Sequence, residues 1–371
     1  MRILYFSHGY STHDRRFLAK MAEPGHQVLF LRLRDDGGAF EGRPLPSGVH
    51  ALRWNGCRGA LTPESCLALM PDFQRLLEEV RPDLLHAGPI PTCAFMGALS
   101  GFHPLVSMSW GSDLLVEAHE SPMVGWAARF ALAHSDWYVV DCDAVRQTVT
   151  SMVPAAADRF VQFPWGLELS RFPPPGPRRG GGPEIVVLST RSWSALYGID
   201  TVIEAFALAH AQEPRLRLVL VGDGTMAPRV EEMIAARGLG DVVRRPGRLP
   251  EEELGHLFAH ADIYLSCSLS DGTSVSLLEA LAYGLPVVVT DAPGNREWVE
   301  GQGGGGAEGG WLAPPGDAGA FAQALVQAAH LDASQRQSVA LRHRALVESR
   351  ADWHANTRRL LAVYQQAGTP A

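Results

Sequence analysis

Short runs of aliphatic and β-branched residues alternate with longer stretches of helical periodicity along the whole chain. A short apolar run has the length of a buried strand, whereas apolar residues that recur at i, i+3 and i+4 indicate a helix with one covered face. Parallel sheets flanked by helices produce this alternation. The pattern therefore predicts an α/β protein with doubly wound, Rossmann-like sheets.

The alternation occurs twice. In the first half the apolar runs predict strands at 3–6, 28–33, 83–87, 105–109 and 137–140, with long helices at 64–80 and 123–133. In the second half they predict strands at 185–189, 216–221, 242–244, 263–266 and 287–290, with helices at 200–210, 227–237, 251–259 and 274–283. Two such domains are expected to face each other across a cleft, with ligands at the carboxyl ends of the strands.

The stretch between these halves, RFPPPGPRRGGGP, is rich in proline and glycine, which disfavour both helix and strand. A chain of 371 residues is also long for one hydrophobic core. We therefore predict an N-terminal domain at 1–172, a linker at 173–183, a C-terminal domain at 184–345 and a terminal helix at 346–371. Whether that helix packs back on the N-terminal domain stays open.

Composition narrows the class of protein. Hydrophobic residues make up 46% of the chain and charged residues 19%, which is globular composition. No apolar run reaches the roughly 18 residues that span a bilayer, and the start, MRILYFSHGY, lacks the apolar segment of a signal peptide. We expect a soluble, cytoplasmic protein, with peripheral membrane contact left open. The formal net charge of −8 disfavours nucleic acid as a partner.

The reactive residue types limit the chemistry further. The five cysteines form no C-x-x-C pair, so the sequence indicates neither a zinc site nor a disulfide framework. Lys20 is the only lysine, so almost every positive charge is an arginine. An interior anion site must therefore use guanidinium groups, backbone amides or helix ends.

The segment SDGTSVSLLEALAYGLPVVVTD, from Ser270 to Asp291, has two interpretations. One is helix capping, because Ser276 and Glu279 fit the capping box S-x-x-E and Gly284 suits the end of a helix. On that interpretation the carboxylate has no role beyond the local backbone.

The other interpretation is a ligand site. A predicted strand ends just before Asp271, and the carboxyl ends of parallel strands are where α/β proteins bind ligands. The small residues Gly272, Thr273 and Ser274 leave backbone amides and the positive end of a helix open to an anion such as a diphosphate. Glu279 follows about 1.5 turns into that helix, within reach of a vicinal diol beside the anion. These acceptors flanking an anion site suit a nucleotide sugar.

At this point the sequence resembles a known family. The segment SLSDGTSVSLLEALAYGLPVVVTDAPGNREWV is similar to the donor-binding motif of the retaining family-4 glycosyltransferases, in which two acidic residues are separated by seven others. The stretches STRSWSALYGIDTVIEAF, LVLVGDG and PWGLELSRF resemble other parts of the same family. The resemblance covers nearly the whole chain and is most specific in the C-terminal half. It implies the GT-B fold, with an acceptor-side domain followed by a nucleotide-sugar domain.

The resemblance also implies a role for each donor-side residue. Glu279 is expected to hold the ribose hydroxyls and Asp271 a hydroxyl of the donor sugar. The amides from Thr273 to Val275 are expected to hold the diphosphate, and Arg191 to contact it from the opposite loop. Arg191 and Asp271 are thus the predicted catalytic residues.

The remaining donor contacts include a departure from the family pattern. The resemblance places the nucleobase near Arg248 and Leu249, and Gly9 in a loop of the N-terminal domain that faces the donor phosphates. Tyr197 stands where the family usually has a diphosphate-binding lysine, which removes a cation. Asp271 replaces the usual glutamate and is one methylene shorter, so the sugar or its position is expected to differ.

Four residues of the N-terminal half are candidates for the acceptor side. Trp110 precedes Gly111 where the family commonly has histidine and glycine, so no histidine role can be transferred; packing of the cleft wall is the alternative for this side chain. Asp113 either caps the next helix or binds the acceptor. His8 and His13, near a strand end, either contact substrate or donate hydrogen bonds within their loops.

We therefore predict a retaining glycosyltransferase, of the hexosyltransferase type, that moves a sugar from a nucleoside-diphosphate donor to a hydroxyl acceptor whose identity the sequence does not give. No metal or cofactor is expected, because the helix start can stabilise the departing diphosphate and the sequence shows no histidine cluster. Two alternatives remain: a nucleotide-sugar epimerase on the same fold, and a nucleotide-sugar-binding protein without turnover.

Overall fold

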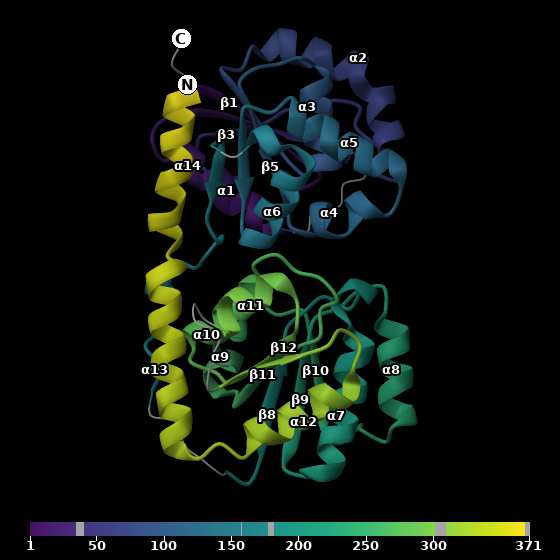
Figure 1. Ribbon diagram of the computed structural model, residues 1–371, viewed down its shortest axis with the longest axis vertical. Coiled ribbons are helices and arrows are strands. Elements are labelled where there is room, and N and C mark those ends of the chain that lie inside the picture. The colour runs from purple at the N-terminus through teal and green to yellow at the C-terminus, as the bar shows by residue number, and fades with distance from the viewer. Residues whose placement is uncertain (35–40, 157, 177–181, 301–308, 368–371) are drawn as a thin grey trace. The chain divides into compact units, whose positions relative to one another are not determined.

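The computed structural model describes residues 1–34, 41–156, 158–176, 182–300 and 309–367, which Figure 1 shows as ribbons. Contacts divide the chain into two compact units. The first unit comprises Met1–Pro164 together with Ala355–Ala371, and the second comprises Trp165–His354. The predicted linker at 173–183 includes residues 177–181, which lie outside the described residues.

Within the described residues, the first unit contains a seven-stranded parallel sheet in the order β3-β2-β1-β4-β5-β6-β7. Its strands are β1 (Arg2–Ser7), β2 (Gln27–Arg32), β3 (Val49–Ala51), β4 (Leu84–Ala87), β5 (Leu105–Met108), β6 (Trp137–Val140) and β7 (Phe160–Gln162). The predicted strands form the centre of the sheet, where both faces are covered and the sequence is almost wholly apolar. The strands β3 and β7, which we did not predict, are the two edges.

Helices surround this sheet (Figure 1). They are α1 (Thr12–Ala22), α2 (Pro63–Val80), α3 (Phe95–Leu99), α4 (Ser112–Leu115), α5 (Pro122–Ala133), α6 (Asp143–Met152) and, near the end of the chain, α14 (Trp353–Ala367). The start of α2 shows why a helix begins there. The Thr62 side chain accepts from Ser65 N at 3.2 Å, and Pro63 occupies the first turn.

As far as the chain is described, the second unit contains a six-stranded parallel sheet in the order β10-β9-β8-β11-β12-β13. Its strands are β8 (Ile185–Ser189), β9 (Leu216–Val221), β10 (Val243–Gly247), β11 (Ile263–Ser266), β12 (Val287–Thr290) and β13 (Gly310–Ala313). Its helices are α7 (Ile199–Gln212), α8 (Ala227–Ala236), α9 (Glu251–His260), α10 (Val275–Ala282), α11 (Pro293–Val299), α12 (Ala318–Ala329) and α13 (Ala333–Arg350). Both sheets are doubly wound, as predicted.

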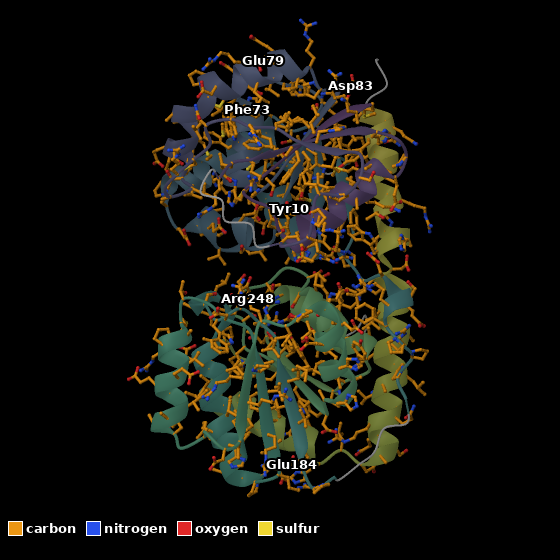
Figure 2. The ribbon with its side chains drawn as sticks, turned by 180° about the vertical axis from the view of Figure 1, so that it is seen from behind. Tyr10, Phe73, Glu79, Asp83, Glu184 and Arg248 are labelled. Atoms are coloured by element: carbon orange, nitrogen blue, oxygen red, sulfur yellow. The ribbon has the colours of Figure 1, made fainter. Side chains whose placement is uncertain are left out.

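Alternate residues of the central strands pack on opposite faces of the second sheet. Val187 and Leu218 belong to one buried apolar cluster, whereas Leu188 and Val219, one residue further along, belong to another. Figure 2 shows side chains filling the interior of each unit. Two cores, one on each face of the sheet, therefore hold the strands and their ends in place.

None of the described helices combines the length and the apolar character that a membrane-spanning segment needs.

Candidate functional site

The sheet of the second unit has a switch point between β8 and β11. From β8 the chain adds β9 and β10 on one side, and it returns to add β11 on the other. The loops that follow the two neighbouring strands diverge at such a point and leave room for a ligand. Arg191 lies in the loop after β8 and Asp271 in the loop after β11. The two predicted catalytic residues therefore meet at the switch point.

Arg191 is held by a carboxylate and two hydroxyl groups. Its Nη2 atom lies 2.8 Å from Asp271 Oδ2, and the two side chains are only 12% and 17% exposed. Its Nη1 atom donates to Ser274 Oγ at 2.7 Å and to Ser276 Oγ at 3.1 Å. The Tyr264 hydroxyl donates to Ser276 Oγ at 2.8 Å. These bonds fix the guanidinium beside the first turn of α10.

The electrostatics keep this guanidinium charged. Burial raises the pKa of Asp271, and the charge and hydrogen bond of Arg191 oppose that rise. Burial also lowers the pKa of Arg191, but the Asp271 carboxylate, together with Tyr197 and Tyr264, outweighs this effect, so the pKa of Arg191 lies above its ordinary value. Arg191 therefore stays positively charged although it is mostly buried, with Asp271 as its carboxylate partner.

Tyr197, which replaces the expected lysine, supports Arg191. The Cζ atom of Arg191 lies 4.2 Å from the centroid of the Tyr197 ring, where a cation is attracted by the aromatic face. The next residue, Gly198, has a φ of +56°, and a Cβ atom there would lie 2.1 Å from the carbonyl oxygen of Cys267. The tyrosine loop is therefore packed against the end of β11. The sequence indicated only that Tyr197 removes a cation and did not reveal this stacking.

The start of α10 tests the capping interpretation of its sequence. The helix begins at Val275 with Ser274 as the N-cap, and Ser274 Oγ accepts from Leu277 N at 3.4 Å. The partner in a capping box would be Leu277, at the third helical position. Glu279 lies two residues further along, so the interpretation of Ser276 and Glu279 as a capping box is wrong.

Gly272 and Thr273 are buried where the β11–α10 loop meets the next helix. A Cβ atom at Gly294, in α11, would lie 2.1 Å from the Gly272 carbonyl oxygen. Only glycine at this position lets α11 approach the loop so closely. Gly294 was not predicted from the sequence, although the donor-binding motif contains it in the stretch APGN.

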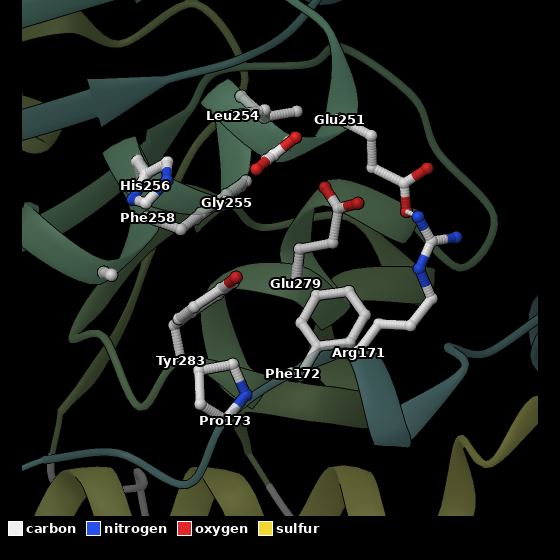
Figure 3. Close-up of a pocket in the computed structure, with 12 residues that line it drawn as sticks. Arg171, Phe172, Pro173, Glu251, Leu254, Gly255, His256, Phe258, Glu279 and Tyr283 are labelled. Atoms are coloured by element: carbon white, nitrogen blue, oxygen red, sulfur yellow. Dashed lines mark ion pairs between the residues drawn. The ribbon is translucent and has the colours of Figure 1, made fainter.

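Glu279 lines a pocket of about 430 Å³ in the second unit. Figure 3 shows its carboxylate pointing into the pocket, with the Tyr283 hydroxyl on one side and the ion pair of Arg171 with Glu251 on the other. That ion pair has a length of 2.7 Å. Burial, together with the charges of Glu279 and Glu251, raises the pKa of Tyr283. Phe172 packs edge-on against Tyr283, with ring centroids 5.5 Å apart.

This pocket differs in charge from the site around Arg191. Its lining holds Glu251, Glu252 and Glu279 but only one arginine, Arg171. Carboxylates repel a diphosphate and accept hydrogen bonds from hydroxyl groups. The pocket therefore suits a diol. Among the residues that line this pocket, Glu279 alone was predicted from the sequence as a site residue. Arg171 and Glu251 are far apart in the chain and come together only in the folded structure.

The residues expected at the nucleobase lie between β10 and α9. Arg248 is exposed, and Leu249 is half-buried against the apolar cluster that contains Phe258 and Tyr283. The same loop leads to Glu251 in the pocket of Glu279. A ligand in that pocket can thus extend toward the β10–α9 loop.

The first unit has its own switch point, between β1 and β4. His8 and buried Gly9 follow β1, and His8 Nε2 lies 2.6 Å from Thr92 Oγ1 in the segment after β4. Burial, with the positive charge of Arg34, lowers the pKa of His8 to about 4. His8 is therefore a neutral imidazole near pH 7.

Asp113 accepts three hydrogen bonds from its surroundings. Its Oδ2 atom accepts from Ile90 N at 2.8 Å, and its Oδ1 atom accepts from Ser109 Oγ at 2.6 Å and Trp110 N at 3.0 Å. Burial raises its pKa to about 6. This carboxylate joins the loops after β4 and β5 rather than capping α4, whose N-cap is Gly111. From the sequence, Asp113 was expected either to cap the next helix or to bind the acceptor. Its hydrogen bonds between the two loops were not predicted.

Trp110 and His13 form an aromatic contact in the first unit. Their ring centroids are 6.1 Å apart and their planes are inclined by 54°. The structure thus brings together two of the residues that the sequence predicted for the acceptor side, although they are far apart in the chain. Both lie near the carboxyl edge of the sheet, in the segments that follow β1 and β5.

Comparison with known proteins gives matches in both halves of the chain. Residues 2–140 match the family model described as glycosyl transferase 4-like, and residues 179–345 match that of glycosyl transferases group 1. Over 206 residues the chain is 31% identical to the putative colanic acid biosynthesis glycosyltransferase WcaL of Escherichia coli K12, a region that covers 54% of this chain and 49% of that protein. The chain thus spans about half the length of this curated relative.

Solved structures resemble the chain over its entire length. Sucrose-phosphate synthase from Thermosynechococcus elongatus superimposes with a TM-score of 0.80 at 19% identity, covering 99% of each chain. HepE from Anabaena, solved in complex with UDP-glucose, superimposes with a TM-score of 0.76 at 20% identity, covering 99% of this chain and 100% of that one. At these identities the likeness establishes the fold.

Proposed function

The chain belongs to the glycosyltransferases with the GT-B fold, and from this premise we propose that it transfers a sugar from a nucleoside-diphosphate donor to a hydroxyl acceptor. One observation carries the proposal. The second unit separates a cationic place, at Arg191 and the start of α10, from a carboxylate pocket around Glu279. A nucleotide sugar has the same division, with a diphosphate between two groups that carry hydroxyls.

We propose the following placement of the donor. Arg191 and the amides from Thr273 to Val275 bind the diphosphate, because a guanidinium and the positive end of a helix both favour phosphate oxygens. Glu279 accepts hydrogen bonds from the ribose hydroxyls, and Asp271 from a hydroxyl of the transferred sugar. HepE was solved with UDP-glucose, so uridine nucleotides are the first donors to examine.

The base is proposed to lie at the β10–α9 loop, against Arg248 and Leu249. Gly9, whose small size lets backbone approach a ligand, is proposed to face the donor phosphates. His8, His13 and Trp110 are proposed for the acceptor side.

We propose that transfer retains the anomeric configuration and needs no metal ion or cofactor. The acidic pair Asp271 and Glu279, separated by seven residues, supports retention through its resemblance to the retaining family. Charge that develops on the leaving diphosphate is stabilised by Arg191 and the helix start, which are organised before the donor binds. The departing phosphate then serves as the base for the acceptor hydroxyl.

The decisive experiment has two stages. Thermal-shift screening of nucleotide sugars identifies the donor, since a ligand at 100 times its dissociation constant stabilises the folded protein by about 2.7 kcal/mol. Incubation of that donor with a panel of saccharide acceptors, in buffer with and without a chelator, is then expected to yield a product with the same anomeric configuration by NMR. Failure of every nucleotide sugar to bind would overturn the proposal.

The same experiment separates the two alternatives. An epimerase converts the donor when no acceptor is present, which the NMR spectrum of the donor alone reveals. A binding protein without turnover shows a higher melting temperature when the donor is added, but it releases no nucleoside diphosphate with any of the acceptors. Transfer to an acceptor, with no conversion of the donor alone, supports the glycosyltransferase.

A further inference from the structure

The first unit contains a pocket of about 290 Å³ that has no role in the proposed donor site. It is lined by Arg32, Arg34, Leu52, Arg53, Trp54 and Asn55. Half of these residues are arginines. The pocket lies where β2 and β3 end, and therefore at the carboxyl edge of the sheet.

Backbone and indole contacts hold the walls of this arginine pocket in place. Arg34 N donates to the His8 carbonyl oxygen at 2.9 Å, which continues the pairing of β2 with β1. Trp54 Nε1 donates to the Arg32 carbonyl oxygen at 2.6 Å. The Trp54 ring packs against Phe6 and Phe73, with centroids 5.9 and 6.1 Å away. The arginines thus extend from a fixed backbone rather than from a loop of variable shape.

Two of the arginines in the pocket, Arg32 and Arg53, have no carboxylate partner within the described residues. By contrast, Arg43, Arg75 and Arg215 each form an ion pair with a carboxylate. Arg32 and Arg53 are exposed, and Arg34 is half-buried. Like charges gathered in one pocket repel each other, and an anion that enters removes the repulsion. Planar guanidinium groups match carboxylate and phosphate oxygens in pairs.

The arginine pocket is next to the residues proposed for the acceptor. The backbone amide of Arg34 donates a hydrogen bond to the backbone of His8. Burial is the main cause of the low pKa of His8, and the positive charge of Arg34 is the second cause. His8 in turn contacts Thr92 across the switch point of this sheet. A group bound by the arginines is therefore close to the carboxyl ends of β1 and β4, where a Rossmann-like domain binds its ligand.

We propose that the arginine pocket binds an anionic group, a carboxylate or a phosphate, carried by the acceptor. The inference rests on the proposed function, and it adds the substrate class: a charged saccharide rather than a neutral one. The recognition is a set of charge-assisted hydrogen bonds from Arg32, Arg34 and Arg53 to the anion, while the acceptor hydroxyl remains free to react.

Calorimetric titration of the full-length protein, in low-salt buffer with UDP present, tests the pocket with glucose 6-phosphate, glucuronate and glucose. We expect at least one charged probe to bind about tenfold or more tightly than glucose, because hydrogen bonds to charged groups are the stronger kind. The double variant Arg32→Gln/Arg53→Gln is expected to remove that preference. Arg75→Gln is the matched control, since Arg75 is exposed on α2 and pairs with Asp72.

The three probes also identify the anion. Tighter binding of glucose 6-phosphate than of glucuronate indicates a phosphate on the acceptor, and the reverse order indicates a carboxylate. Binding of glucose as tightly as both charged probes, no measurable heat from any of the three, or an equal loss in Arg75→Gln would each overturn the inference.

UDP affinity, measured on the same samples, separates this inference from the proposed function. The double variant lies in the first unit and is expected to bind UDP as the wild type does. If UDP binds but the charged probes show no preference, only the arginine pocket is refuted. If UDP and the nucleotide sugars fail to bind to the wild type, the donor-side proposal itself fails.

Discussion

The two switch points of the molecule treat buried charge in opposite ways. In the second unit, Asp271 is paired with a cation, Arg191, that three oxygen acceptors hold in place. In the first unit, Asp113 forms no ion pair among the described residues, and its oxygens accept hydrogen bonds from two backbone amides and a hydroxyl. One carboxylate belongs to an arrangement that a ligand can join, whereas the other is a structural connector.

The comparison teaches that a buried acid at the carboxyl edge of a strand is not by itself a catalytic group. The two carboxylates differ in their partners. Two backbone amides and a hydroxyl donate hydrogen bonds to Asp113, whereas Asp271 pairs with Arg191, a cation that also attracts phosphate. In the first unit, three arginines instead gather in the arginine pocket. Four measurements can break or sharpen this contrast.

The largest effect is expected at Asp113, as a dependence of stability on pH. Its pKa is about 6 in the folded protein and near 3.8 as a free group, so the folded state binds more protons between these values. Stability therefore falls as pH rises from about 4 to about 6, by about 3 kcal/mol, and is flat above. The variant Asp113→Asn is expected to lose this dependence in denaturation curves taken across the pH range.

The exposed residue Asp158 supplies the control for that measurement, through Asp158→Asn. If Asp113→Asn and the wild type change stability in parallel with pH, Asp113 is not the buried titrating group that the structure indicates.

The second effect is expected at Arg191. Arg191→Ala removes a charged donor from the proposed diphosphate site and should lower transfer efficiency by about 2 kcal/mol or more, roughly thirtyfold, in steady-state kinetics. It also leaves Asp271 without its cation, so the double variant Arg191→Ala/Asp271→Ala is expected to recover stability but not activity. Arg229→Ala, which breaks an exposed pair with Glu232, is the control. Recovery of activity in the double variant would show that the loss came from folding.

The third effect is expected at Glu279. Glu279→Gln keeps the size of the side chain but weakens a charge-assisted hydrogen bond, so UDP affinity should fall about tenfold in calorimetry. Glu232→Gln, on the exposed face of α8, serves as the control. Unchanged affinity would assign the carboxylate pocket to a different ligand.

The smallest effect is expected at Tyr197. Tyr197→Phe keeps the ring under Arg191 and should cost less than about 1 kcal/mol in transfer efficiency, whereas Tyr197→Leu loses the aromatic face and should cost more than Tyr197→Phe. Steady-state kinetics on both variants measure the difference. A larger loss in Tyr197→Phe than in Tyr197→Leu would mean that the hydroxyl, and not the ring, is the functional part.

The central strands could be predicted from the sequence because they are buried on both faces. In Val287–Thr290, for example, three consecutive valines are followed by a threonine at the strand's carboxyl end, and all four residues are buried. The edge strands β3, β7 and β13 were missed because each has only three or four residues and at least one exposed or half-buried side. Each of these strands is held in the sheet by pairing with one neighbouring strand, and the local sequence pattern carries no information about that pairing.

The candidate site was predictable to the extent that it is local. Asp271, Ser274 and Glu279 fall within one strand–loop–helix segment, so spacing alone relates them. The stacking of Tyr197 on Arg191 and the pairing of Arg171 with Glu251 need loops brought together by the sheet. The arginine pocket was not predicted, because Arg34 and Arg53 lie on separate strand ends with no motif to connect them.

The last helix has a consequence for the order in which the protein folds during synthesis. The side chain of Tyr364, in α14, is fully buried in the first unit, where its hydroxyl bonds to His86 Nδ1 in β4. Asn356 Nδ2 likewise donates to the Pro164 carbonyl oxygen at 2.9 Å. Translation delivers residues 165–354 before this helix. The first unit therefore cannot complete its core until the whole of the second unit has been synthesised, which departs from the usual N-terminal-first order of domain folding.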